Sequence, residues 1–209
     1  MKVLLHNIGN KFYGCAQFER SPCGFYFARH AESTYNQQGI SSGGDRNPGL
    51  TRFGIEQAEG IARALGDCEV LPGMVITPPS SRNVDTARII SQVLGLDMRI
   101  ENALMERFLG DWNEQSSELT ASLLKQGITP PNGENAQHFS KRILGSFQSL
   151  SRFFDRLPLI IGSRGSSRIL FQELTKSTQT HLDNGEIVLV HVASMDLRIS
   201  NLQRIQPKS

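Results

Sequence analysis

A basic pair, Arg29 and His30, directly follows a short apolar stretch at residues 25–28 and opens a polar segment. In open α/β sheets, ligands bind outside the carboxyl ends of the strands, where side chains leave the core. An arginine offers a planar, charged fork for phosphate oxygens, and a neutral imidazole can carry a phosphoryl group as a nucleophile. The pair therefore predicts a phosphoryl-transfer site. The alternative is a chance pairing in which the histidine merely ends a strand.

Further motifs follow this pair along the chain. They are ARHAESTYN at residues 28–36, GDRNPGLTRFGIEQA at 44–58, TPPSSRNVDTA at 77–87 and MERFLGDW at 105–112. Their content and order resemble the histidine phosphatase superfamily, the phosphoglycerate mutase-like proteins. Ala31 stands where that family usually has glycine, and a glycine is inserted before Leu50. The resemblance extends from residue 24 to about residue 175.

The resemblance implies a role for each matching residue. His30 would attack the phosphorus in line. Glu106 would protonate the leaving oxygen and later deprotonate water, because one carboxyl can serve both half-reactions. Arg29 and Arg82 would hold the phosphate, and Asn36 would contact phosphate or substrate. Two alternatives stay open, namely Arg82 as a helix-face arginine and Glu106 as a solvated loop acid.

The chain departs from the family at residues 159–170, where Arg164 replaces the second catalytic histidine. The helix that begins there would present free N–H groups, including that of Gly165, to the phosphate. In the family this histidine donates hydrogen bonds to phosphoryl oxygens, so another donor can replace it. An arginine, however, is longer, cannot deprotonate, and could pair with Glu106 and so remove the acid.

The other histidines lie in no motif, and we assign them no chemistry. We expect His138 and His181 at the surface and His191 packed on a strand, while His6 precedes the resemblance. No cofactor or metal is expected, because the nucleophile is an imidazole and the charge-stabilising groups are arginines.

The motifs predict a phosphomonoester hydrolase that forms a phosphohistidine on His30, with activity weakened by Arg164. Residues 108–114 are apolar and acidic, which favours a phosphatase over a mutase, and residues 130–136 resemble the family's lid region. The substrate would be a phosphorylated small molecule or a phosphoprotein. The alternative is an inactive pseudophosphatase that binds phosphate or a phosphoprotein, since Arg164 adds affinity for anions. A purely scaffolding role would leave the arginines idle.

Alternating strand and helix patterns must position these residues. Strands are predicted at residues 25–28, 74–76, 159–161 and 187–192. Helices are predicted after Thr51 (core face Ile55, Ala58, Ala62, Leu65), from Ser80 or Ser81 (Val84, Ala87, Ile90, Leu94) and over 136–157 (Phe139, Ile143, Phe147, Leu150, Phe154, Leu157). This order predicts a three-layer α/β/α fold of the phosphoglycerate mutase-like type, with a mainly parallel sheet.

Length and composition agree with one domain at residues 23–209, preceded by an N-terminal extension at 1–22 that suggests an added strand or hairpin. The formal net charge is +2 with both signs interspersed, which gives no indication of nucleic-acid or membrane binding. The odd set Cys15, Cys23 and Cys68 does not resemble a zinc site, so we expect incidental reduced thiols. The start lacks the apolar core of a signal peptide, so we expect a cytoplasmic location. Oligomeric state cannot be read from the sequence.

Overall fold

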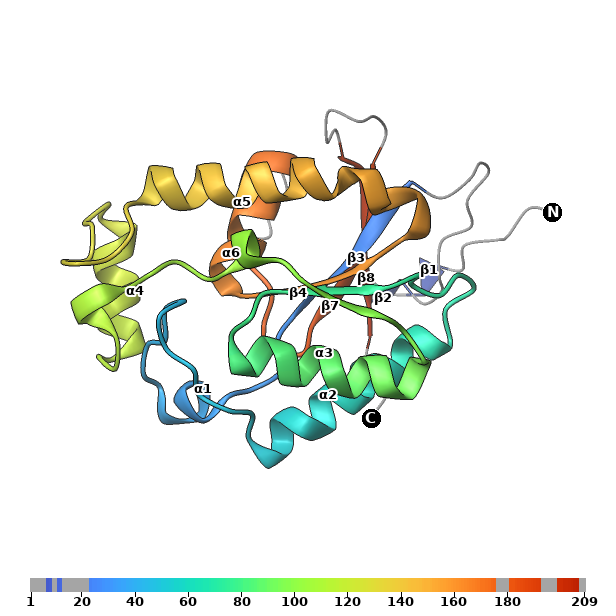
Figure 1. The fold of residues 1–209 in the computed structure, drawn as a ribbon, viewed down its shortest axis with the longest axis horizontal. Coiled ribbons are helices and arrows are strands. Elements are labelled where there is room, and N and C mark those ends of the chain that lie inside the picture. Colours follow the sequence, from blue (N-terminus) through green and yellow to red (C-terminus); the bar gives the residue numbers. More distant parts are fainter. Residues whose placement is uncertain (1–6, 9–10, 13–22, 176–180, 193–198, 207–209) are drawn as a thin grey trace.

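A computed structural model of the chain describes residues 7–8, 11–12, 23–175, 181–192 and 199–206. Its main feature is a six-stranded sheet in the order β5-β4-β6-β3-β7-β8 (Figure 1). The strands are β3 (Gly24–Arg29), β4 (Val75–Thr77), β5 (Met98–Ile100), β6 (Leu159–Gly162), β7 (Ile187–Val192) and β8 (Ile199–Ile205). Because β3 lies between β6 and β7 and is buried along its whole length, it carries its last residues into the interior.

Helices cover both faces of this sheet (Figure 1). The longer elements are α2 (Arg52–Gly66) and α3 (Ser81–Leu94) on one face, and α5 (Ala136–Leu150), η3 (Ser151–Arg156), α6 (Arg164–Ile169) and the π-helical η4 (Leu170–Thr175) on the other. Alternate residues of β3 serve the two layers: Phe27 packs in one cluster with Phe147 of α5, and Tyr26 packs in the other with Ile61 of α2. The predicted three-layer α/β/α fold is confirmed.

The sheet is mixed. The pairings β5·β4, β4·β6 and β6·β3 are parallel, as the prediction of a mainly parallel sheet requires, whereas β7 is antiparallel to both β3 and β8. The sequence patterns gave no indication of β8. In an antiparallel pair the start of one strand lies beside the end of the other, so the chain entering β7 reaches the end of β3 that carries Arg29.

The predicted start signals of α2 and α3 are confirmed. The Thr51 hydroxyl accepts a hydrogen bond from Gly54 N at 2.9 Å, and Ser80 is the N-cap of α3. The expected core face of α2 was wrong at Ile55, which is 43% exposed. Gly54 is buried instead, because the backbone of Glu32 lies so close that a Cβ atom would overlap it.

The core face of α3 also differs from the expected one. Val84 and Leu94 are only partly buried, whereas Arg82, Asn83 and Thr86 are fully buried with Ala87 and Ile90. The amino-terminal turn of α3 therefore faces a polar interior rather than the apolar core.

The stripe predicted for α5 is confirmed, because all of its six residues are buried. Within it, the ring centroids of Phe147 and Phe154 lie 5.4 and 4.7 Å, respectively, from the ring centroid of Phe25 in β3. The regular helix ends at Leu150, and Phe154 belongs to the following η3. This aromatic cluster anchors the central strand from one side.

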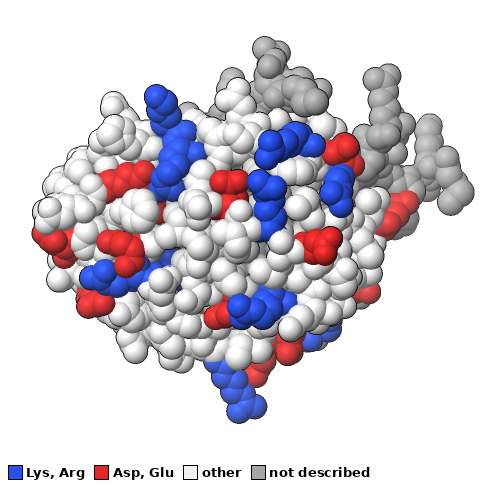
Figure 2. All heavy atoms as spheres, in the orientation of Figure 1, with Lys and Arg blue, Asp and Glu red and all other residues white. Residues whose placement is uncertain are grey.

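Short elements fill the connections: α1 (Thr34–Gln38), η1 (Asn102–Leu104), η2 (Gly110–Trp112) and α4 (Ser117–Lys125). At the N-terminus, β1 (Asn7–Ile8) and β2 (Lys11–Phe12) pair antiparallel, and the rest of the predicted extension at 1–22, with His6 and Cys15, lies outside the described residues. Cys23 is exposed, whereas Cys68 is buried and its thiol donates to Ala64 O at 3.4 Å. Among the described helices none has the length and apolar character needed to cross a bilayer. On the face in Figure 2, acidic and basic side chains are interspersed.

Candidate active site

Arg29 and His30 lie at the carboxyl end of the central strand, as predicted. Their residue exposures are only 7% and 3%. The His30 amide donates to Gly162 O at the end of β6 at 2.9 Å, which holds this point of the chain next to the start of α6. The end of β3 and the start of α6 thus lie side by side at one edge of the sheet.

The His30 ring is held in a form that suits nucleophilic attack. Its Nδ1 lies 2.8 Å from the carbonyl oxygen of Ala31, which can only accept, so Nδ1 carries the proton and Nε2 keeps its lone pair. Burial, followed by the positive charges of Arg82 and Arg29, lowers the pKa of His30 well below its ordinary value. The imidazole is therefore neutral at physiological pH.

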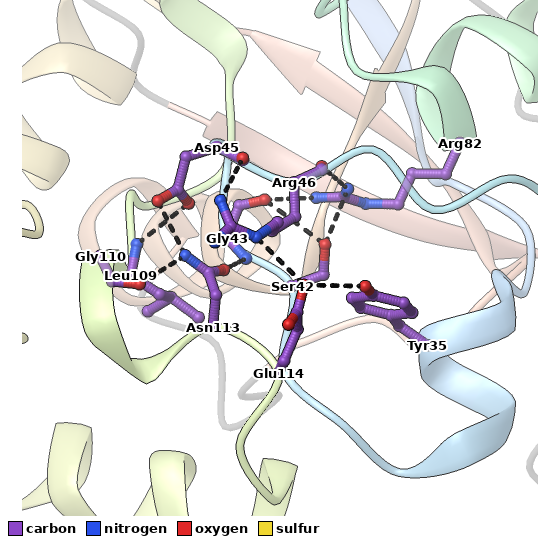
Figure 3. Close-up of polar contacts among 10 residues, drawn as sticks. All are labelled: Tyr35, Ser42, Gly43, Asp45, Arg46, Arg82, Leu109, Gly110, Asn113 and Glu114. Carbon is purple, nitrogen blue, oxygen red and sulfur yellow. Dashed lines mark hydrogen bonds and ion pairs between the residues drawn. The ribbon is translucent and has the colours of Figure 1, made fainter.

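Arg82 reaches His30 from the first turn of α3. Its Nε donates to His30 Nε2 at 3.3 Å, and its two terminal nitrogens donate to Ser42 Oγ at 3.1 Å, Arg46 O at 3.0 Å and Gly43 O at 3.3 Å (Figure 3). Burial lowers the pKa of Arg82, and the charge of Glu106 opposes that shift. The side chain is 2% exposed, which contradicts the alternative of a solvated helix-face arginine.

The loop that receives Arg82, residues 42–46, is fixed by a second polar network. Asn113 Oδ1 accepts from Gly43 N at 2.8 Å, and Asn113 Nδ2 donates to Asp45 Oδ2 at 2.7 Å and Gly110 O at 2.8 Å (Figure 3). Asp45 Oδ1 accepts from Leu109 N at 3.4 Å. The network joins the 42–46 loop to the segment that follows Glu106.

An outer layer of the same network lies near the surface. Glu114 pairs with Arg46 at 3.2 Å and accepts from the Tyr35 hydroxyl at 3.0 Å (Figure 3). Both Arg46 and Glu114 are about half exposed, so this pair contributes little to stability. It marks the outer edge of the 42–46 loop.

Glu106 is held by two backbone amides. Its Oε2 accepts from Gly165 N at 2.8 Å and its Oε1 accepts from Arg107 N at 2.7 Å. A Cβ atom at Gly165 would overlap Oε1, so only glycine permits this approach. Gly165 was expected to give its N–H to phosphate, and in this structure that N–H positions Glu106 instead. The side chain is partly buried, unlike the solvated loop acid of the alternative interpretation.

Arg29 has a donor without a partner among the described residues. Its Nη1 donates to Leu182 O at 3.0 Å, but its buried Nε has no hydrogen-bond partner in the described part of the chain. Burial, followed by the charge of Arg164, lowers the pKa of Arg29 to about 10, and Glu106 opposes the shift. Arg29 therefore stays charged at neutral pH with a buried N–H still to satisfy, which indicates a site for an anion.

Asn36 is connected to His30 through Asn184. Its Oδ1 accepts from the backbone amide of Ser33 at 3.1 Å and from the Ser33 hydroxyl at 2.9 Å, which caps α1. Asn184 Nδ2 donates to the same oxygen at 3.2 Å. The observed role of Asn36 is structural, and its contact with substrate stays a prediction.

Arg164 begins α6, as the sequence predicted, and its guanidinium lies at the surface. Its Nη2 is 3.2 Å from His181 Nε2. None of the ion pairs formed by the described residues joins Arg164 to Glu106, so the acid is not lost in such a pair. His181, which was expected at the surface, is partly exposed, at 27% of its side chain. His138 is exposed, as expected, and His191 lies on β7.

The segment of residues 181–184 contributes contacts that sequence analysis missed. Leu182 O supports Arg29, and Asn184 Nδ2 donates to His30 O at 2.9 Å. These contacts follow from the antiparallel pairing of β7 with β3, which puts the chain before Ile187 beside the end of β3. The sequence offered no sign of that orientation. No group of three metal-ligating side chains occurs in the described part of the chain.

Comparisons with known proteins relate this geometry to a family. Residues 25–203 match the family model of the histidine phosphatase superfamily (branch 1). The chain is 28% identical over 169 residues to a 2,3-bisphosphoglycerate-dependent phosphoglycerate mutase of Parvibaculum lavamentivorans, covering 72% of this chain and 79% of the relative. It is 30% identical over 138 residues to the adenosylcobalamin/alpha-ribazole phosphatase of Escherichia coli, covering 61% of this chain and 66% of that relative. The crystal structure of the alpha-ribazole phosphatase from Shigella flexneri has the same fold, with a TM-score of 0.71 at 24% identity, covering 88% of this chain and 96% of that one.

Proposed function

Because this chain belongs to the histidine phosphatase superfamily, we propose that it hydrolyses phosphomonoesters through a phosphohistidine on His30. The His30 Nε2 lone pair attacks the phosphorus, the P–O bond to the leaving group breaks, and Glu106 gives its proton to the departing oxygen. Water then attacks the phosphohistidine, loses a proton to Glu106 and releases inorganic phosphate, so that His30 is regenerated.

The observation that carries the proposal is the buried environment of His30. A neutral imidazole, whose Nε2 lone pair accepts from Arg82 Nε, lies between two buried arginines, and the Nε–H of the other, Arg29, has no partner among the described residues. Burying two cations without an ion-pair partner is costly, and a phosphate oxyanion would offset that cost. The same anion would take over the Arg82 Nε–H that now faces His30 Nε2, which frees this lone pair for attack.

The position of Glu106 supports its role as the acid. Among the charges that raise the pKa of Arg29 and the pKa of Arg82, the charge of Glu106 has the largest effect in each case. Glu106 therefore lies within electrostatic reach of both proposed phosphate ligands. The amides of Gly165 and Arg107 hold its two oxygens in place. We propose a phosphorylated small molecule as substrate, by analogy with the small-molecule names of the relatives.

The alternative is a protein that binds phosphate or a phosphoprotein without turnover, because Arg164 replaces a histidine that the family uses. The Arg164 guanidinium contacts His181, and no ion pair among the described residues joins it to Glu106, which favours turnover. Loss of one well-placed transition-state donor lowers rates by about 100 to 1,000-fold, which weakens but does not abolish catalysis.

Phosphate release from an aryl phosphate tests the proposal, with the unaltered protein, His30→Ala and Arg164→His compared. We expect slow turnover by the unaltered protein, none by His30→Ala, and faster turnover by Arg164→His. His138→Ala, at an exposed histidine in the first turn of α5, is the matched control and should retain full activity. Phosphate binding without release by any variant would instead support the non-catalytic alternative.

A further inference from the structure

The guanidinium of Arg164 has an unusual partner. Its Nη2 lies 3.2 Å from His181 Nε2, and a guanidinium can only donate, so the imidazole accepts and is neutral in this contact. None of the ion pairs found within the described ranges includes Arg164. His181 thus orients the Arg164 guanidinium but, as a neutral group, does not neutralise its positive charge.

The backbone that carries His181 is tied to the site. Leu182 N donates to Ser167 Oγ on α6 at 3.1 Å, and Leu182 O accepts from Arg29 at 3.0 Å. Two residues further on, Asn184 donates to His30 O at 2.9 Å. The 181–184 segment therefore touches Arg29, His30 and α6 within four residues, and His181 extends the same support to Arg164.

Arg164 also acts on the phosphate ligands already described. After burial, its charge is the largest influence that lowers the pKa of Arg29, so the two guanidinium groups are close enough to repel each other. An anion that lies between or beside two like charges offsets their repulsion. Phosphate at Arg29 would be such an anion.

We propose that His181 is a positioning residue that holds Arg164 over the phosphate site, where Arg164 serves as a third phosphate-binding arginine. This inference rests on the proposed phosphate site at Arg29 and His30. His181 does not touch the phosphate in this arrangement. It donates no hydrogen bond to the phosphate itself. Instead, it fixes the orientation of the long and flexible Arg164 side chain, whose ordering would otherwise cost binding free energy.

The contact depends on the protonation state of His181. The charged groups acting on it are Arg164, Arg29 and Arg168, which oppose protonation, and Asp183, whose Oδ1 is 3.7 Å from Nε2 and favours it. Burial is the largest cause that lowers the pKa of His181 below its ordinary value. The contact is intact above that lowered pKa and is lost as the pH falls through it, because an imidazolium cannot accept from Arg164 and would turn to Asp183.

Inorganic phosphate binding, measured by calorimetry, tests this without requiring turnover. We expect Arg164→Ala to weaken phosphate affinity by about tenfold or more, as for the loss of one charge-assisted hydrogen bond. His181→Ala should weaken it by about threefold to tenfold, and the double variant should be no weaker than Arg164→Ala alone. His181→Gln keeps a hydrogen-bond acceptor that does not titrate, so its phosphate affinity should match that of the unaltered protein. It should also lack the part of the affinity loss at acid pH that protonation of His181 causes in the unaltered protein. His138→Ala should match the unaltered protein.

The inference is overturned if His181→Ala binds phosphate as tightly as the unaltered protein, if its effect adds fully to that of Arg164→Ala, or if His181→Gln is as weak as His181→Ala. It is also overturned if Arg164→Ala leaves the affinity unchanged or if the unaltered protein binds no phosphate. A protein that shows the expected binding pattern but releases no phosphate from an ester would contradict only the hydrolase proposal, so the two failures are distinguishable.

Discussion

At the scale of single residues, chemistry depends on the proton of His30. The Nδ1 proton is committed to the Ala31 carbonyl, and two arginines surround the ring. Burial and the two arginines lower the pKa of His30 and outweigh the Ala31 hydrogen bond, which raises it. The proposed nucleophile is therefore available without a base to deprotonate it.

The first prediction concerns pH. Since the pKa of His30 lies well below its ordinary value, the neutral nucleophile persists below pH 6.5 and is lost only as the pH falls through the lowered value. The acid limb of kcat/KM for an aryl phosphate should therefore begin below pH 6.5. A profile that loses activity with an apparent pKa at or above 6.5 would contradict the assigned environment of His30.

The second prediction concerns the glycine beside the acid. Gly165→Ala should lower kcat/KM by about tenfold or more, because the new methyl group displaces the Glu106 carboxylate. Gly145→Ala on α5 is the matched control, since its added Cβ meets no atom within 4 Å. That control should keep full activity and gain about 0.5–1 kcal/mol in stability. Equal activities of the two variants would show that Glu106 does not need its present position.

At the scale of elements, the site is built from the ends of segments that the fold brings to one edge. β3 supplies Arg29 and His30, the first turn of α3 supplies Arg82, and Gly165 at the start of α6 fixes Glu106. The loop 42–46 then surrounds Arg82 and is itself held by Asn113 (Figure 3).

The third prediction tests that loop. Asn113→Ala leaves the buried Gly43 N–H without its acceptor and removes a partner of Asp45, so it should destabilise the protein by about 1–3 kcal/mol in denaturant unfolding. It should also raise KM, because the loop that orients Arg82 loosens. Asn102→Ala, at an exposed residue, is the control and should change stability by less than about 0.5 kcal/mol. If Asn113→Ala changed neither the unfolding free energy nor KM, the network would contribute nothing to holding the 42–46 loop.

The sequence predicted those elements whose signals are local. The apolar run before Arg29, the N-cap at Thr51 and the spacing of the α5 stripe each follow from a few neighbouring residues. The 181–184 segment could not be predicted in this way, because its place depends on the antiparallel pairing of β7 with β3. Arg164 was correctly placed at a helix start, yet its partner His181 is distant in sequence and was expected at the surface.

At the scale of the whole molecule, the site depends on a sheet anchored from both faces. Phe25 and Phe27 of β3 contact Phe147 of α5, while Tyr26 and Ala28 pack against the layer of α2. Because β3 ends at Arg29 and leads directly into His30, any loss of packing behind the strand is transmitted to the proposed site through one continuous element.

The fourth prediction measures that anchoring. Phe147→Ala removes a fully buried ring and should cost about 3–5 kcal/mol in unfolding free energy. Phe53→Ala is the matched control, since this ring is 55% exposed, and it should change stability by less than about 0.5 kcal/mol. Comparable losses for the two variants would mean that the aromatic cluster does not anchor β3.

The family model and the similar solved structure show the family and the fold. The phosphohistidine on His30 is the proposed intermediate of the reaction. The measurement that tests this most directly is capture of the phosphoenzyme. The protein is mixed with an aryl phosphate, quenched under alkaline conditions that preserve phosphohistidine, and analysed by intact and peptide mass spectrometry. We predict one added phosphoryl group on the peptide that contains His30, and none in His30→Ala. Turnover without that label, or a label that persists in His30→Ala, would contradict the account.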